Sequence, residues 1–186
     1  MLAKRLFDIS FSLLALMLLS WLILVLFIFC SIDTLSSGLF CQKRIGQFGN
    51  PFTILKLKTV RPVSRTISPF GRLLRKVKLD ELPQLINVLV GDMSFVGPRP
   101  DIPGYYDELK GQNRKILELK PGITSPASIK YSDEEQILSH QQDPLRYNDE
   151  VIFPDKVRLN LQYYHTRSFL GDLKIICATF LKFFNG

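Results

Sequence analysis

The chain has 186 residues, a formal net charge of +7 at pH 7, and 46% hydrophobic residues. This length allows one domain plus a membrane segment and excludes two full domains. The charge predicts an anionic partner, and nucleic acid, acidic lipid and a nucleotide-sugar diphosphate fit it equally well. The three cysteines form no C-x-x-C pair, which argues against a disulfide framework and favours a reducing compartment. The two histidines, His140 and His165, lie far apart, so any metal would be a hard, oxygen-liganded ion such as Mg²⁺.

A membrane-length apolar segment stands near the N-terminus. Residues Ile9 to Cys30 are apolar apart from three serines, and about 20 such residues in a helix can span a hydrocarbon core. Lys4 and Arg5 precede the segment, and Lys43 and Arg44 follow it, so the positive-inside rule assigns both ends to the cytoplasm. A helix that enters the membrane and returns on the same side satisfies both pairs. A single span with the N-terminus outside is the alternative.

Two short strands are expected after this segment. Leu39–Ile45 and Phe52–Lys58 have strand composition and flank a turn that contains glycine, asparagine and proline. Alternation along the second strand places Lys56 and Lys58 on one face. Two ammonium groups on one face suit a diphosphate, whereas the simpler interpretation is a solvated strand edge protected by lysines.

The region from Ile67 to Leu79 is predicted to be a basic amphipathic helix. Apolar residues recur in it at helical spacing, and basic residues, including Arg75, occupy the other face. Such a helix can lie in a membrane interface. An ordinary surface helix packed on a core would show the same pattern.

An acidic pair, Asp80 and Glu81, follows this helix. Pro83 marks the start of another helix, which we expect over Gln84 to Val90 and which stops at Gly91. The pair therefore lies at the approach to a helix N-terminus, where free amides and the helix dipole stabilise anions. Adjacent residues do not share a helix face, so the two carboxylates are expected to have different roles. The simpler interpretation is a solvated acidic pair next to lysines.

Farther along, Gly97–Pro100 is predicted to be stiff and extended. Its two prolines restrict the backbone around Arg99, whose planar guanidinium matches phosphate oxygens. The remaining chain is expected to be mostly helical, which makes the whole fold helix-rich α+β. The expected helices cover Pro103–Leu119, a segment from a Ser132/Glu135 capping box through Ser139, a segment from Pro154 to about Tyr164, and a last helix capped by Asp172 with an apolar stripe ending at Phe184.

Three runs, in order, resemble the bacterial sugar transferase family of monotopic polyprenyl-phosphate phosphoglycosyl transferases. They are K-R-L-F-D (Lys4–Asp8), K-L-D-E-L-P-Q (Lys78–Gln84) and G-D-M-S-F-V-G-P-R-P (Gly91–Pro100), and P-G-I-T at Pro121–Thr124 also matches. The resemblance covers nearly the whole chain. It implies a re-entrant membrane helix over residues 1–36 and a catalytic domain over residues 37–186, with a short β-hairpin and interfacial helices. The expected location is the cytoplasmic face of the bacterial inner membrane.

The resemblance also implies a reaction. Asp80 would attack the β-phosphorus of a UDP-sugar, release UMP and hold the sugar 1-phosphate as an acyl phosphate. A polyprenyl phosphate such as undecaprenyl phosphate would then accept it, in ping-pong order, as the first membrane step of surface glycan or glycoconjugate assembly. Glu81 would bind Mg²⁺. Basic side chains would hold the phosphates: Lys56, Lys58, Arg75 and Arg99.

The sequence departs from the family pattern at three places, one of which is the stretch between Thr59 and Phe70, which is shorter than in many members. Trp21 stands after Ser20, where the family has a helix-breaking proline, so Ser20 would have to bend the helix by bonding a carbonyl one turn back. The stretch Ser125–Tyr131 after P-G-I-T also differs, so the identity of the sugar cannot be transferred from the family. The oligomeric state, including a homodimer, stays open.

Two other classes of function fit the sequence less well. A membrane-tethered nucleic-acid module is disfavoured because aromatic and basic residues are poorly interleaved and no helix-turn-helix or RNA-binding signature is present. The expected partners are therefore a UDP-sugar, a polyprenyl phosphate and inner-membrane lipid, with no nucleic acid. An inactive scaffold is disfavoured by the intact acidic pair and both arginines.

Overall fold

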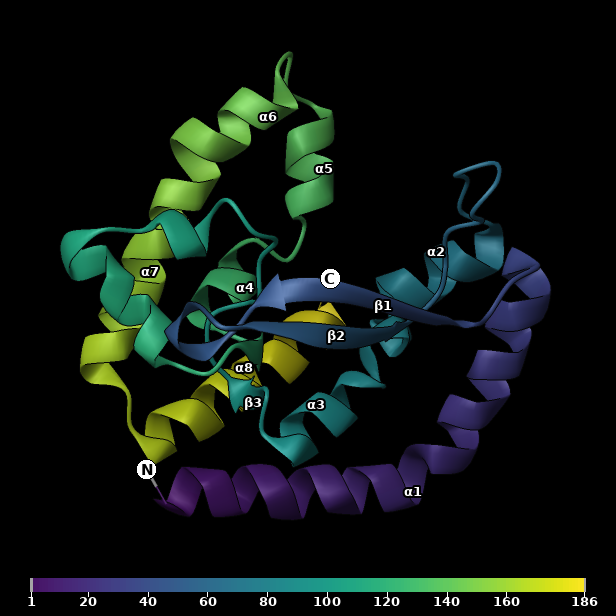
Figure 1. Ribbon diagram of the computed structural model, residues 1–186, viewed down its shortest axis with the longest axis horizontal. Helices are drawn as coiled ribbons and strands as arrows, with labels where there is room; N and C mark the ends of the chain where they lie inside the picture. The colour runs from purple at the N-terminus through teal and green to yellow at the C-terminus, as the bar shows by residue number, and fades with distance from the viewer. Residues whose placement is uncertain (1, 186) are drawn as a thin grey trace. The chain divides into compact units, whose positions relative to one another are not determined.

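The computed structural model describes the backbone of residues 2–185 and the side chains of residues 2–182. It is helix-rich, as Figure 1 shows, and its described residues form two small two-stranded sheets. The predicted α+β class is confirmed. The chain forms two compact units. The first runs to Arg44 and resumes over Pro51–Met93; the second contains Ile45–Asn50 and the chain from Ser94 onward.

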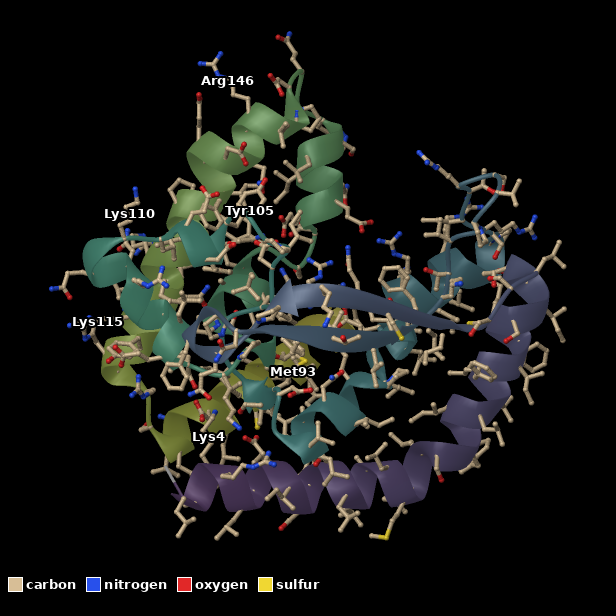
Figure 2. All side chains as sticks on the ribbon, in the orientation of Figure 1. Lys4, Met93, Tyr105, Lys110, Lys115 and Arg146 are labelled. Carbon is tan, nitrogen blue, oxygen red and sulfur yellow. The ribbon has the colours of Figure 1, made fainter. Side chains whose placement is uncertain are left out.

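Helix α1 (Leu2–Thr34) is the longest element of the first unit. Among the described residues it is the one helix with the length and hydropathy to cross a membrane. In Figure 1 it runs in two parts that meet at an angle about halfway along. Its buried residues lie toward its two ends: Asp8, Ser12, Leu26, Cys30 and Thr34. Residues 13–25, all of them described, include none that is buried, and apolar side chains project outward from α1 in Figure 2.

The bend in α1 does not come from a hydrogen bond between the Ser20 hydroxyl and a backbone carbonyl one turn earlier. Three hydroxyl side chains of α1 donate to the carbonyl four residues earlier, at 2.6–2.8 Å: Ser12, Ser31 and Thr34. Within the described chain Ser20 makes no such bond, and its side chain is exposed. What the structure shows instead is that both ends of α1 are held against the same unit. Leu26 and Cys30 pack with Leu57 and Leu74 at one end, and the other end lies along α3 (Gln84–Val90).

A hairpin of β1 (Leu39–Ile45) and β2 (Pro51–Leu57) follows α1. The sequence prediction of both strands is confirmed, with β2 shifted by one residue. The turn between them needs two left-handed residues, Phe48 (φ 61°) and Gly49 (φ 82°). Strand β2 carries Leu57 into the core of the first unit and Lys56 toward the acidic pair.

Helix α2 (Pro69–Lys76) is shorter at both ends than the predicted span of residues 67–79. It starts where the Ser68 hydroxyl accepts a hydrogen bond from the Gly71 amide at 2.9 Å, with Pro69 in the first turn. It ends because Lys78 adopts φ 55°, which no right-handed helix tolerates. The single 3₁₀ turn Leu79–Glu81 then leads to α3, whose predicted bounds are confirmed and which stops at Gly91 (φ 99°).

The second unit contains a pair of strands that the sequence analysis did not anticipate. Strands β3 (Ser94–Val96) and β4 (Gly122–Thr124) pair in parallel, with Ser94 opposite Gly122 and Val96 opposite Thr124. The G-D-M-S-F-V-G and P-G-I-T runs therefore lie side by side. A Cβ added to Gly122 would lie 2.1 Å from the Gly97 amide nitrogen, so this close approach requires glycine.

The predicted helix over Pro103–Leu119 is wrong. The chain there forms two 3₁₀ segments, Tyr106–Glu108 and Gly111–Glu118. Gly104 (φ 101°) and Gly111 (φ 58°) are left-handed, which interrupts any α-helix. The Asp107 carboxylate also accepts from the Gly104 and Tyr105 amides at 2.8 and 3.0 Å, so a side chain replaces the helical backbone partners.

The other helices of the second unit are α4 (Pro126–Lys130), α5 (Glu134–Ser139), α6 (Pro144–Tyr147), α7 (Phe153–Thr166) and α8 (Phe169–Asn185). Two predicted caps are wrong. The N-cap of α5 is Asp133 rather than Ser132, and its side chain makes no capping bond. Asp172 lies inside the first turn of α8, where its carboxylate accepts from the Tyr163 hydroxyl at 2.6 Å, while Ser168 accepts from the Gly171 amide. The Phe184 side chain of the predicted stripe lies outside the described side chains.

Candidate active site

The acidic pair is buried in the turn between α2 and α3. Asp80 and Glu81 are 7% and 9% exposed, although carboxylates normally face water. The residue before this turn, Lys78, holds a left-handed conformation that costs free energy for any side chain larger than glycine. The Glu81 amide donates to the Lys78 carbonyl at 3.2 Å, which closes the turn. Backbone strain next to two buried acids marks this turn as the candidate site.

The two carboxylates have different surroundings. The Lys56 Nζ on β2 lies 2.9 Å from the Glu81 Oε1, as an ion pair that is mostly shielded from solvent. The Asp80 Oδ1, in contrast, is buried and has no hydrogen-bond partner among the described residues. Leaving a buried acceptor without a partner costs the full desolvation of that atom, so each such atom requires an explanation such as a catalytic role, a bound ion or a water.

Burial also changes the acidity of Asp80. Desolvation raises the pKa of this carboxyl, and the neighbouring Glu81 charge raises it further. The charges of Lys56, Lys78 and Arg75 act in the opposite direction. These three cations lie close enough to stabilise added negative charge, which is what an incoming phosphate would bring. Sequence reasoning did not assign a role to Lys78, although it opens the K-L-D-E-L-P-Q run.

The structure places two of the predicted phosphate ligands, Lys56 and Arg75, near the acidic pair. Lys56 contacts Glu81, and Arg75 in the last turn of α2 is half-buried near Asp80. Lys58 points elsewhere, because its Nζ donates to the Ser36 hydroxyl at 3.2 Å, just after the end of α1. Arg99 belongs to the second unit, after β3, and is half-buried. The site described here consists of residues of the first unit alone.

Sequence reasoning also missed the residue that fixes α3 to β2. The Asn87 Oδ1 accepts from the Leu55 amide at 3.1 Å, and its Nδ2 donates to the Thr53 carbonyl at 2.8 Å. This buried amide holds the helix after the acidic pair against the strand that carries Lys56. The signal was present as two amides, Gln84 and Asn87, spaced three residues apart on an otherwise apolar helix.

The K-R-L-F-D run has a structural role at the opposite end of α3. The Arg5 guanidinium donates to the carbonyls of Val88 and Leu89, at 2.7 and 2.8 Å. These are carbonyls of the last turn of α3, where the helix dipole favours a cation. Arg5 therefore holds the start of α1 against α3, the helix that follows the acidic pair. Figure 1 shows α3 lying along the first part of α1.

The donor atoms of the acidic pair fit a magnesium ion. Carboxylate oxygens are the protein ligands that Mg²⁺ prefers, and this ion usually keeps only one or two of them together with water and substrate phosphates. Within the described residues no group of three or more His, Cys, Asp or Glu side chains gathers to form a complete cage. The pair thus suits an ion that arrives with a diphosphate.

Comparison with known proteins identifies the family of the chain. The model of the bacterial sugar transferase family matches residues 1–186. The chain is 34% identical over 192 residues to the uncharacterized sugar transferase EpsL of Bacillus subtilis, covering 98% of this chain and 87% of that protein. It is 33% identical over 198 residues to the undecaprenyl-phosphate glucose phosphotransferase of Komagataeibacter xylinus, covering 96% of this chain but only 35% of that protein.

A further relative is the UDP-glucose:undecaprenyl-phosphate glucose-1-phosphate transferase of Caulobacter vibrioides. It is 31% identical over 195 residues, covering 96% of this chain and 68% of that protein. The chain belongs to the bacterial sugar transferase family, a family of transferase enzymes, and the resemblance inferred from its motifs is confirmed.

Proposed function

We propose that this protein transfers a sugar 1-phosphate from a UDP-sugar to undecaprenyl phosphate and releases UMP, as the first membrane step in assembling a surface glycan. The names of the Komagataeibacter and Caulobacter relatives support the two substrates. The single observation that carries the chemistry is the buried Asp80 Oδ1 without a hydrogen-bond partner among the described residues, next to the Lys56–Glu81 ion pair. A carboxylate oxygen that no protein donor occupies can form a bond to phosphorus without first losing a hydrogen bond.

The proposed reaction has two displacements at one phosphorus. In the first, an Asp80 carboxylate oxygen forms a bond to the β-phosphorus, and the bond from that phosphorus to the oxygen bridging it to UMP breaks. UMP leaves with the bonding electron pair, and the sugar phosphate stays on Asp80 as an acyl phosphate. In the second, an oxygen of undecaprenyl phosphate bonds to the same phosphorus and the Asp80 carboxylate is released. The product is a polyprenyl diphosphate sugar.

The protein's cations would offset the charge that makes this attack difficult. An anionic carboxylate approaches an anionic phosphate, so fixed positive charge must be present beforehand. Lys56, Lys78 and Arg75 supply it around Asp80. We assign Arg99 and Lys58 to phosphate binding on the resemblance alone. Glu81 would hold Mg²⁺, and a bound Mg²⁺ supplies further neutralisation of the diphosphate oxygens.

We propose that α1 enters the bilayer and returns. Its two ends pack on one unit, through Arg5 on α3 and through Cys30 on the core with Leu57 and Leu74. A crossing helix would separate these ends by the hydrocarbon core of about 30 Å. The exposed apolar middle would then lie in lipid, with the rest of the unit at the cytoplasmic face of the inner membrane. Helix α2, with Leu73 exposed among basic residues, suits the interface.

A UMP-release assay tests the proposed function. The purified full-length protein in detergent or nanodiscs is given Mg²⁺, undecaprenyl phosphate and each member of a UDP-sugar panel. At least one UDP-sugar should release UMP and yield a lipid-linked diphosphate sugar. Absence of UMP release across the panel, by protein that remains folded, would contradict the proposal.

A further inference from the structure

A second buried polar atom without a partner lies close to Asp80 in the sequence. The Gln84 Nε2 is buried and has no hydrogen-bond partner among the described residues, as is true of the Asp80 Oδ1. The Gln84 side chain is 1% exposed. One five-residue segment of the first unit thus holds both a buried acceptor and a buried donor that the described protein does not satisfy.

The lack of a hydrogen-bond partner is not a general property of side-chain amides on α3. Three residues later, the buried Asn87 amide is bonded at both ends, to the Leu55 amide and the Thr53 carbonyl of β2. The unit can therefore satisfy a buried carboxamide on this helix. An unsatisfied donor costs free energy, so its presence at Gln84 indicates a partner supplied from outside the chain.

The local backbone places Gln84 one turn beyond the acidic pair. Leu82 and Pro83 both have right-handed helical dihedrals. Amides on either side of Gln84 bond three residues back, from Leu82 to Leu79 and from Leu85 to Leu82. In such turns, side chains three or four residues apart lie on neighbouring parts of one side. The Gln84 side chain is therefore three residues after Glu81 and four after Asp80, within one turn of both carboxylates.

We propose that the Gln84 carboxamide contacts the substrate, donating a hydrogen bond from Nε2 to a non-bridging oxygen of the phosphate that Asp80 attacks. This inference rests on the proposed function and adds a donor to it. The group nearest to an attacking oxygen is the phosphorus with its own oxygens, and these are the strongest acceptors in the substrate. A neutral donor held in a buried site gains strength as charge builds on the phosphoryl oxygens, so it should act mainly on kcat.

The substitution Gln84→Met tests this assignment, because methionine keeps the unbranched shape and burial but removes the donor. The melting temperature should stay equal or rise, since a buried unsatisfied group is lost. Turnover should fall about 100-fold, as for removal of one preorganised donor to a developing oxyanion. The loss should appear in kcat, and in the single-turnover rate of UMP release with UDP-sugar alone, with a smaller change in KM.

The matched control is Asn87→Met, which deletes an amide of the same kind three residues away. Its melting temperature should fall, because the Leu55 amide and the Thr53 carbonyl lose their partners. Wild-type kcat in Gln84→Met, or a loss of activity that parallels a loss of melting temperature, would overturn the inference. A loss of rate confined to the second displacement, the transfer from Asp80 to undecaprenyl phosphate, would also overturn the inference. Failure of the proposed function is distinguishable, because the wild-type protein itself would then release no UMP.

Discussion

The Lys56 Nζ lies 2.9 Å from the Glu81 Oε1, whereas the Oδ1 of the adjacent Asp80 has no hydrogen-bond partner among the described residues. Two neighbouring acids in one turn thus have different electrostatic surroundings. The sequence predicts such a division, because adjacent helical residues do not share a face. Glu81 is suited to hold a cation in place, and Asp80 is suited to act on an incoming group.

The pH dependence of the reaction should reflect the raised pKa of Asp80. Attack requires the ionised carboxylate, and burial with the Glu81 charge raises its pKa above the ordinary value. The acid limb of kcat/KM should therefore lie above pH 3.9, the usual pKa of an aspartate. The variant Lys56→Met should move this limb to still higher pH, because a cation that lowers the pKa of Asp80 is removed. A pH–rate profile of the wild-type protein and of Lys56→Met measures both acid limbs. A wild-type acid limb at or below pH 3.9, the usual aspartate value, would contradict the assignment of Asp80 as the attacking group.

Removal of Arg5 should weaken the first unit. The variant Arg5→Met loses two hydrogen bonds to the last turn of α3. Bonds to a charged group contribute about 1.5–3 kcal/mol each when buried, and Arg5 is half-buried, so we expect a total loss of roughly 1–3 kcal/mol. Thermal unfolding in detergent would measure it. The matched control is Lys43→Met, which removes an exposed charge from β1 and should leave the melting temperature nearly unchanged.

Much of the first unit was predictable because its signals are local. The bounds of β1 and α3 follow from the Gly and Pro residues and from the apolar spacing around them. The contacts that complete the site are not local. Asn87 bonds partners more than thirty positions away, and β3 pairs with a strand that begins at Gly122. A single sequence does not encode those pairings in any periodic pattern.

The predicted helix over residues 103–119 failed for a different reason. Its composition favours a helix, but Gly104 and Gly111 take left-handed conformations and Asp107 bonds to backbone amides. Glycine permits such conformations, but the sequence alone does not show which glycines adopt them. The Asp80 Oδ1 and the Gln84 Nε2 have no hydrogen-bond partner among the described residues, and this could not be predicted, because an absent hydrogen bond can be recognised only in three dimensions.

Activity should depend on a divalent cation. Two carboxylates and a diphosphate offer only oxygen ligands, which favours Mg²⁺ or Mn²⁺. Stripping metal with EDTA should abolish UMP release, and added Mg²⁺ should restore it. Glu81→Gln should raise the Mg²⁺ concentration needed for half-maximal activity. Full turnover in chelator after metal stripping would show that the protein's cations alone suffice.

The two ends of α1 should lie on the same side of the membrane. In a protein whose native cysteines are replaced, a cysteine at Ala3 and another at Ser37 should both resist an impermeant thiol reagent in spheroplasts and react once these are opened. A cysteine at Trp21, in the exposed apolar middle, should stay unreactive in both states. Labelling of the Ala3 position in intact spheroplasts would mean that the helix crosses the bilayer.

The covalent intermediate is the most direct test of the central claim. Wild-type protein incubated with Mg²⁺ and a UDP-sugar that supports turnover, without any polyprenyl phosphate, should gain the mass of one sugar phosphate. Peptide mapping should place that mass on Asp80. The variant Asp80→Asn retains the size of the side chain but not the anion, and should neither gain the mass nor release UMP. An unmodified wild-type protein, or an Asp80→Asn variant that turns over at the wild-type rate, would contradict the account.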